Sequence, residues 1–132
     1  MGKKQMEKIF DGNFLTLYSQ IGLYDTEDPS SYPSWETGTE ALVFSDKGVA
    51  VATKGDHLIH VLVFDNPIET GTLFFLGRGK RRVGNRGLTI GNEIAASSDH
   101  LDWNEGLTQV EIYGNSPNGE ATEVIYVLKY LG

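Results

Sequence analysis

The sequence contains no cysteine, and this absence excludes several kinds of protein. Without thiols the chain has no disulfide framework, no thiolate metal site and no cysteine nucleophile. No stretch of its 132 residues approaches the roughly 20 consecutive apolar residues that a membrane-spanning helix needs. A chain of this length forms one domain, which buries about two-thirds of its unfolded surface and needs no covalent staple.

Basic residues are also scarce. The chain has 11 Lys and Arg residues against 18 Asp and Glu, and its net charge of −7 disfavours bulk attraction to nucleic acid or anionic membranes. The same charge suits a basic partner. The N-terminal stretch lacks the apolar segment and the cleavage site of a secretory signal, so we expect a cytoplasmic protein.

The clearest structural pattern runs from Ala41 to Phe64. It contains three short runs of β-branched and apolar residues, separated by glycine-containing turns at 46–48 and 54–56. This pattern predicts three consecutive strands. The third run, from His57 to Phe64, has apolar residues on both faces, which predicts a central strand that is covered on both sides.

The rest of the chain predicts further strands near residues 14–24, 72–76, 88–94, 107–113 and 122–131, with the last one interior. We therefore expect an all-β fold, an antiparallel β-sandwich of about eight strands, with a β-barrel as the alternative. This single domain is expected to span residues 14–132. Residues 1–13 are polar and are expected to form an N-terminal arm.

Two acidic loops that contain aromatic residues are the first candidate binding site. The segment from Asp25 to Glu40 has two prolines and no basic residue, and loops longer than about 12 residues in a compact domain are usually functional or disordered. The second loop runs from Ser97 to Gly106. Acidic charge suits a basic protein partner, and tyrosine and tryptophan are favoured anchors at interfaces. The candidate residues are Asp25, Glu27, Asp28, Tyr32, Trp35, Glu36, Glu40, Asp102 and Trp103.

These loops have other interpretations. The first imitates the span of a calcium-binding EF-hand loop, but Pro29 and Ser30 stand at its fifth and sixth positions and no helix flanks it. The first loop could equally be a solvated surface loop. Trp35 and Trp103 could also fold inward and cover the core. If both loops lie at one end of the sandwich, they form a single acidic patch, opposite in sign to the basic segment described below.

The sequence shows no sign of catalytic chemistry. His57, His60 and His100 lack the spacing of metal ligands, and no nucleophile elbow is present. We therefore expect no catalytic residues, no metal, no cofactor and no enzymatic activity.

Five of the 11 basic residues lie between Gly77 and Gly87. The glycine spacing from Gly79 to Gly84 is that of a phosphate-binding P-loop, but Asn85 and Arg86 stand where lysine and a hydroxyl residue are needed. The segment fits a solvated hairpin tip or a nucleic-acid-binding or phosphate-binding loop. The lack of aromatic residues among the basic ones disfavours nucleic acid. The residues of this alternative site are Arg78, Lys80, Arg81, Arg82 and Arg86.

Several features occur in a recognisable order along most of the chain. They are an aromatic strand ending near Tyr24, Pro33-Ser34-Trp35 in the acidic loop, Gly38 to Ala41 leading into Leu42-Val43-Phe44, then Gly87 to Ile90 and the strands of Tyr113 and Tyr126. This order resembles the competence protein J family, small intracellular inhibitors of a bacterial DNA-entry nuclease. The basic segment departs from that pattern. The resemblance implies a stoichiometric protein inhibitor of a nuclease, without catalysis of its own.

Overall fold

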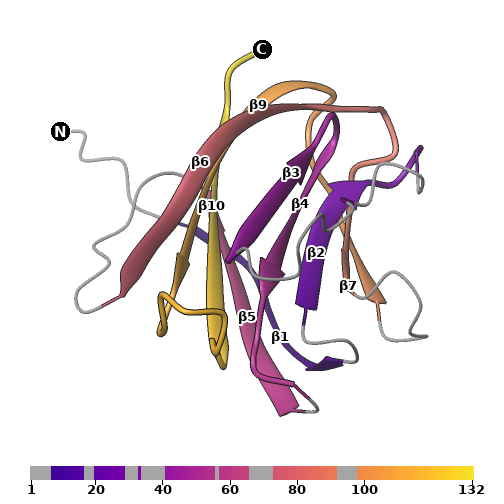
Figure 1. The fold of residues 1–132 in the computed structure, drawn as a ribbon. Helices are drawn as coiled ribbons and strands as arrows, with labels where there is room; N and C mark the ends of the chain where they lie inside the picture. Colours follow the sequence, from indigo (N-terminus) through magenta and orange to yellow (C-terminus); the bar gives the residue numbers. More distant parts are fainter. Residues whose placement is uncertain are drawn as a thin grey trace, which may run out of the picture.

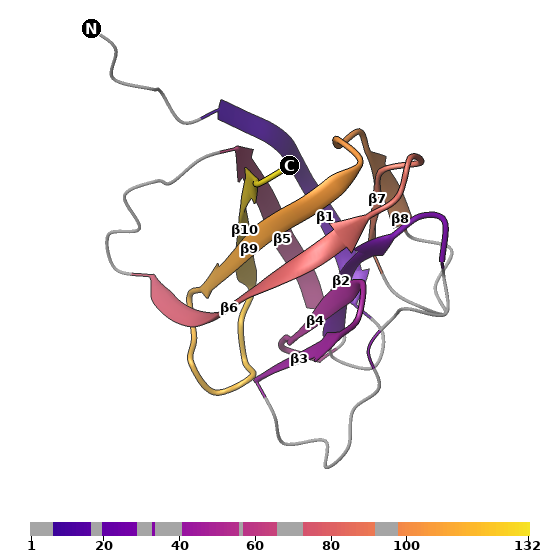
Figure 2. The same ribbon diagram turned by 90° about the horizontal axis from the view of Figure 1, so that it is seen from above.

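The structure is a computed structural model that describes residues 7–16, 20–28, 33, 41–55, 57–65, 73–91 and 98–132. Two five-stranded sheets pack face to face (Figures 1 and 2). The predicted all-β sandwich is confirmed, with ten strands in these ranges rather than about eight. Within the same ranges, no helix has the length and apolar composition needed to span a membrane.

Each sheet is built from strands that are distant in the sequence. The first contains, in spatial order, β1 (Glu7–Thr16), β5 (His57–Asp65), β10 (Glu123–Tyr130), β9 (Gly106–Gly114) and β6 (Phe74–Val83). The second contains β3 (Leu42–Ser45), β4 (Gly48–Ala52), β2 (Gln20–Asp25), β7 (Leu88–Gly91) and β8 (Ser98–Leu101).

Inward-facing aliphatic side chains fill the space between the sheets. In β5 the alternate residues Ile59, Val61 and Val63 are fully buried, as expected for a strand with one face on the core. Among the described residues, Tyr126 of β10 is the largest fully buried side chain, and its hydroxyl donates a hydrogen bond to the carbonyl oxygen of Ile21 in β2 at 3.4 Å. This bond joins the two sheets through the middle of the core.

The predicted strands between residues 41 and 64 are present, but they do not form one sheet. β3 and β4 form a hairpin in the second sheet, whereas β5 belongs to the first, antiparallel to β1 and parallel to β10. The expected cover over the outer face of β5 is wrong, since Leu58 is 58% exposed. The last strand is interior as predicted: Ile125 and Val127, on the outer face of β10, are both buried.

β1 begins at Glu7, so residues 7–13 are not part of a polar arm. Antiparallel pairing with β5 extends from Glu7 to Thr16. The polar residues that suggested an arm, such as Asp11 and Asn13, alternate on the outer face, while Phe14 is buried against the core.

The basic segment is a strand rather than a loop, and only residues 84–87 form a turn. Gly77 and Gly79 of β6 face β3 of the opposite sheet. A Cβ atom at Gly77 would collide with the side chain of Leu42, and one at Gly79 would lie 3.0 Å from Cε1 of Phe44. Glycine at these positions therefore allows close approach of the two edge strands.

Candidate functional site

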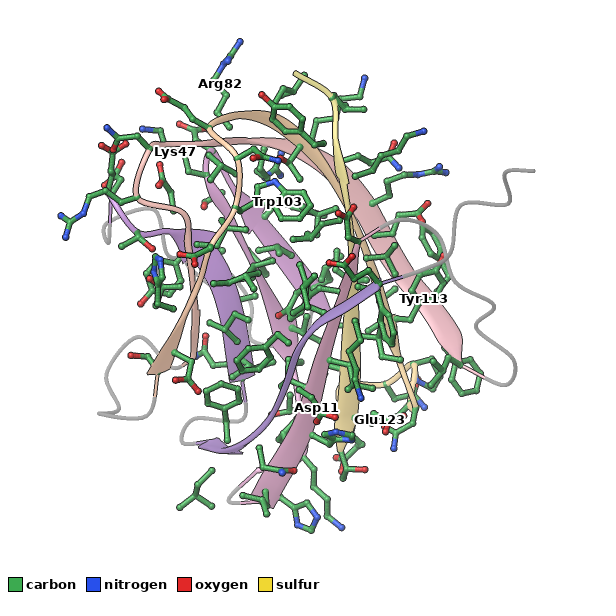
Figure 3. The ribbon with its side chains drawn as sticks, turned by 180° about the vertical axis from the view of Figure 1, so that it is seen from behind. Asp11, Lys47, Arg82, Trp103, Tyr113 and Glu123 are labelled. Atoms are coloured by element: carbon green, nitrogen blue, oxygen red, sulfur yellow. The ribbon has the colours of Figure 1, made fainter. Side chains whose placement is uncertain are left out.

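Three connections meet at one end of the sandwich. They are residues 26–28 after β2, the turn at 84–87 between β6 and β7, and residues 102–105 between β8 and β9. The Thr26 N–H donates a hydrogen bond to the Gly87 carbonyl at 3.0 Å. We call this region the Trp103 end, after its large aromatic side chain (Figure 3). Together the connections line a hollow of about 390 Å³, formed by Thr26, Asn85, Arg86, Gly87, His100, Asp102 and Trp103.

Asp25 supports this end from inside. The residue is 1% exposed, and its Oδ1 accepts hydrogen bonds from the N–H groups of Glu27 at 3.1 Å and Gly84 at 3.3 Å. A buried carboxylate with these donors joins the segment after β2 to the turn after β6. The expectation that Asp25 presents its charge to a partner is therefore wrong.

Glu27 and Asp28 lie nearer to solvent. Glu27 Oε2 accepts a hydrogen bond from the Asn85 N–H at 3.2 Å, and Asp28 Oδ2 lies 3.8 Å from Lys47 Nζ. Exposed contacts of this kind contribute little stability. Both carboxylates can therefore exchange these contacts for those of a bound protein.

Trp103 is half-buried and held in a fixed position. Its indole N–H donates a hydrogen bond to Oγ1 of Thr108 at 2.7 Å, and Thr108 is fully buried in β9. The side chain also packs against the hydrophobic core. It covers the core, as the lid interpretation expects, and still lines the hollow.

Asp102 is fully exposed beside this ring. Its Oδ1 lies 3.1 Å from Nε2 of His100. Asp102 and Trp103 also line a second hollow of about 330 Å³, whose other side carries two more carboxylates. The residues around this acidic hollow are Glu7, Ile9, Asp65, Asp102, Trp103 and Asn104.

The described parts of the two acidic loops do lie at one end, because Thr26 and Asp102 line the same hollow. The end is not uniformly acidic, since Arg86 lines that hollow as well. Among the described residues, no group of three or more histidine or acidic side chains is arranged to hold a metal ion. The other predicted binding residues, Tyr32, Trp35, Glu36 and Glu40, lie outside the described residues.

The five basic residues of the alternative site do not share one surface. Arg81 faces inward, where its guanidinium lies 4.3 Å from the centre of the Phe44 ring and its Nε donates a hydrogen bond to the Gly48 carbonyl at 3.3 Å. Burial lowers the pKa of Arg81. Arg86 belongs to the turn at the Trp103 end. The outward-facing members on β6 are Arg78, Lys80 and Arg82, of which Arg82 projects away from the body of the sandwich (Figure 3).

A further cluster crosses the outer face of the first sheet. His60 of β5 lies between Asp11 of β1, at 2.7 Å from Nε2, and Glu123 of β10, at 3.1 Å from Nδ1 (Figure 3). The hydrogen bond with Asp11 raises the pKa of His60 and lowers the pKa of Asp11, which also pairs with Lys8 at 3.1 Å. No spacing in the sequence points to this cluster, because strand register brings its members together.

No family model matches the sequence, and no curated protein matches it. Among solved structures, the chain is similar to ComJ from Bacillus subtilis, described as the inhibitor of the DNA degrading activity of NucA. The TM-score is 0.71, and the likeness covers 97% of this chain and 100% of that chain. The two proteins share a fold. This confirms the resemblance to competence protein J in fold, and at 15% identity it shows the fold alone.

Because the likeness to ComJ shows only the fold, the site has to be located from this chain's own residues. Asp102 and Trp103, two of the predicted binding residues, line the acidic hollow. Glu7 and Asp65 of that hollow were missed, because they come from β1 and β5 and have no motif in common.

Proposed function

We propose that this protein is a non-catalytic inhibitor that binds a nuclease through the Trp103 end. The observation that carries the proposal is the fold shared with ComJ over almost the whole of both chains. ComJ is described as an inhibitor of a DNA-degrading activity, and a protein inhibitor acts through its surface rather than through catalytic groups of its own.

The chemistry of the Trp103 end supports this proposal. A nuclease holds phosphates, so its active site presents cations. The acidic hollow offers the carboxylates of Glu7, Asp65 and Asp102 beside a half-buried tryptophan. The charges would set the rate of encounter, and the aromatic contact would set the lifetime of the complex. The proposed interface also includes Glu27, Asp28, Tyr32, Trp35, Glu36 and Glu40.

Titration against a DNA-degrading nuclease from the same source organism tests the proposal. We expect DNA cleavage to stop near an equimolar ratio, because one inhibitor blocks one active site. Undiminished cleavage in excess protein would contradict inhibition. DNA loss without added nuclease would contradict a non-catalytic role.

Variants of the Trp103 end locate the interface in the same assay. Asp102→Lys should slow association about tenfold or more at low salt, since electrostatic steering depends on such exposed charges. Glu120→Lys makes the same charge change in the turn at the opposite end and should bind as the parent does. Trp103→Ala should shorten the lifetime of the complex, and its thermal unfolding would show whether the core is intact. Equal association rates for the two lysine variants would exclude this surface.

A further inference from the structure

We infer that the outer face of β6 and β9, together with Lys129 near the end of β10, binds single-stranded nucleic acid through a row of cations beside two aromatic rings. The inference does not depend on nuclease inhibition, because this surface and the proposed interface share no residue. We call the surface the basic face. It consists of Arg78, Lys80, Arg82, Lys129, Phe75 and Tyr113.

Strand pairing brings these cations together from distant parts of the chain. Lys80 of β6 and Lys129 of β10 stand on either side of Gln109 of β9, all on the outer face. Directly paired residues have Cβ atoms about 4.5–5.5 Å apart, and alternate residues along a strand are about 7 Å apart. Arg78 and Arg82 therefore continue the row on each side of Lys80.

Most of this positive charge is not neutralised by the described part of the chain. Arg78 Nη1 lies 3.4 Å from Glu111 Oε2. Lys80, Arg82 and Lys129 are exposed and form no ion pair with any described residue. Three such cations on one face of a chain with a net charge of −7 create a local field opposite in sign to the rest. A row of this kind attracts a polyanion.

Two aromatic rings lie on the same face, near the start of β6. Phe75 is 53% exposed, and its ring centre lies 5.5 Å from that of Tyr113. The guanidinium carbon of Arg78 lies 5.9 Å from the Phe75 ring centre. An exposed ring such as Phe75, supported by the partly buried Tyr113 and placed beside cations, is an arrangement on which proteins stack unpaired bases. Neither ring lies within residues 77–87, which is why the sequence alone disfavoured nucleic acid.

The form of the basic face favours a single strand over a duplex. It is a sheet surface, about 24 Å long from Phe75 to Arg82 at 3.4 Å per residue. It presents no helix or two-stranded ribbon that would enter a major groove. A single strand can stack its bases on the rings while its phosphates meet the cations, whereas a duplex keeps its bases paired inside.

Fluorescence anisotropy with a labelled oligothymidylate of about 20 nucleotides tests the inference. We expect binding at low salt and a slope near −2 for the logarithm of the binding constant against that of salt, because each of three free cations releases about 0.7 counterion from a single strand. The variant Lys80→Gln/Arg82→Gln/Lys129→Gln should bind at least about tenfold more weakly. The control Lys8→Gln/Lys47→Gln/Lys54→Gln removes the same charge elsewhere and should bind within about twofold of the parent.

The rings are tested by a separate pair of variants. Phe75→Ala should weaken binding at least about fivefold, as loss of one stacked base does. Phe74→Ala, at a neighbour that is 45% exposed, should bind as the parent does. Circular dichroism of every variant checks that it is folded.

Several results would each overturn the inference. They are no binding by the parent at low salt, unchanged binding by the triple variant of the basic face, and equal binding of a duplex or of polyglutamate. Loss of nucleic-acid binding with inhibition retained is expected for the triple variant. That result separates this inference from the proposed function.

Discussion

Asp25 is the buried acceptor of two backbone hydrogen bonds inside the Trp103 end. We expect Asp25→Ala to lower the free energy of unfolding by about 1–3 kcal/mol, because the N–H groups of Glu27 and Gly84 lose their acceptor. Urea unfolding followed by circular dichroism measures this change. The exposed Asp99→Ala should stay within about 0.5 kcal/mol of the parent, and an equal loss in both variants would contradict the structural role of Asp25.

His60 predicts how stability changes with pH. Its pKa in the folded protein is raised above 6.5 by Asp11 and, more weakly, by Glu123, so its stabilisation is fully present below the unfolded pKa and is lost as pH rises through the folded one. Asp11, whose pKa is lowered from 3.8, contributes stability above its unfolded pKa that is lost as pH falls through the folded one. The cluster therefore stabilises the fold most between about pH 4 and 6.5.

The variant His60→Gln tests this pH dependence. The urea midpoints of parent and variant should differ most near pH 5.5, and the difference should shrink by pH 9. The effect should be small, because the cluster is partly exposed and surface ion pairs are weak. His57→Gln, an exposed position on the same strand, is the matched control. A difference that grows toward pH 9 would contradict the assignment.

At the scale of secondary-structure elements, glycine is needed for different reasons at a position within β6 and at one just before β7. Gly77 of β6 accommodates the flexible end of the Leu42 side chain, which can move aside. Gly87, which precedes β7, has a φ of 78° and would place a Cβ atom 2.6 Å from the Leu101 carbonyl oxygen, which belongs to the backbone of β8. The structure therefore tolerates a side chain better at position 77 than at position 87.

We expect Gly87→Ala to cost about 2 kcal/mol or more, since it combines backbone strain with a clash against backbone. Gly77→Ala should cost less than about 1 kcal/mol, because removal of a flexible glycine from a strand offsets part of the crowding. Chemical denaturation of both variants measures the two costs. Equal costs would mean that β7 and β8 can move apart as easily as the Leu42 side chain can turn.

At the scale of the whole molecule, the sandwich carries two proposed binding surfaces of different charge. The loops of the Trp103 end carry most of the proposed inhibitor interface, whereas the basic face lies on β6, β9 and β10 of the first sheet. A net charge of −7 describes neither surface, because it averages over both.

Much of the fold was predictable because the side chains of a strand point alternately to its two faces, so the sequence shows which faces are apolar. The hairpin of β3 and β4 was predicted from two apolar runs around a glycine-containing turn, and the interior strand β10 from apolar residues on both of its faces. β1 was missed over residues 7–13 because its outward residues, Asp11 and Asn13, are polar. β6 was predicted as a strand only up to Leu76, because glycine and arginine are typical of loops, whereas here the glycines make room for β3.

The sequence by itself determined the fold class, the acidic charge and the absence of thiol chemistry, since these depend on composition and on local alternation. Only the tertiary structure decided which residues share a surface. Asp25 is buried because the turn after β6 closes over it, and Lys80 and Lys129 are neighbours because β9 lies between their strands. The register of strands that are distant in sequence is set by the packing of both sheets together, and no local pattern contains it.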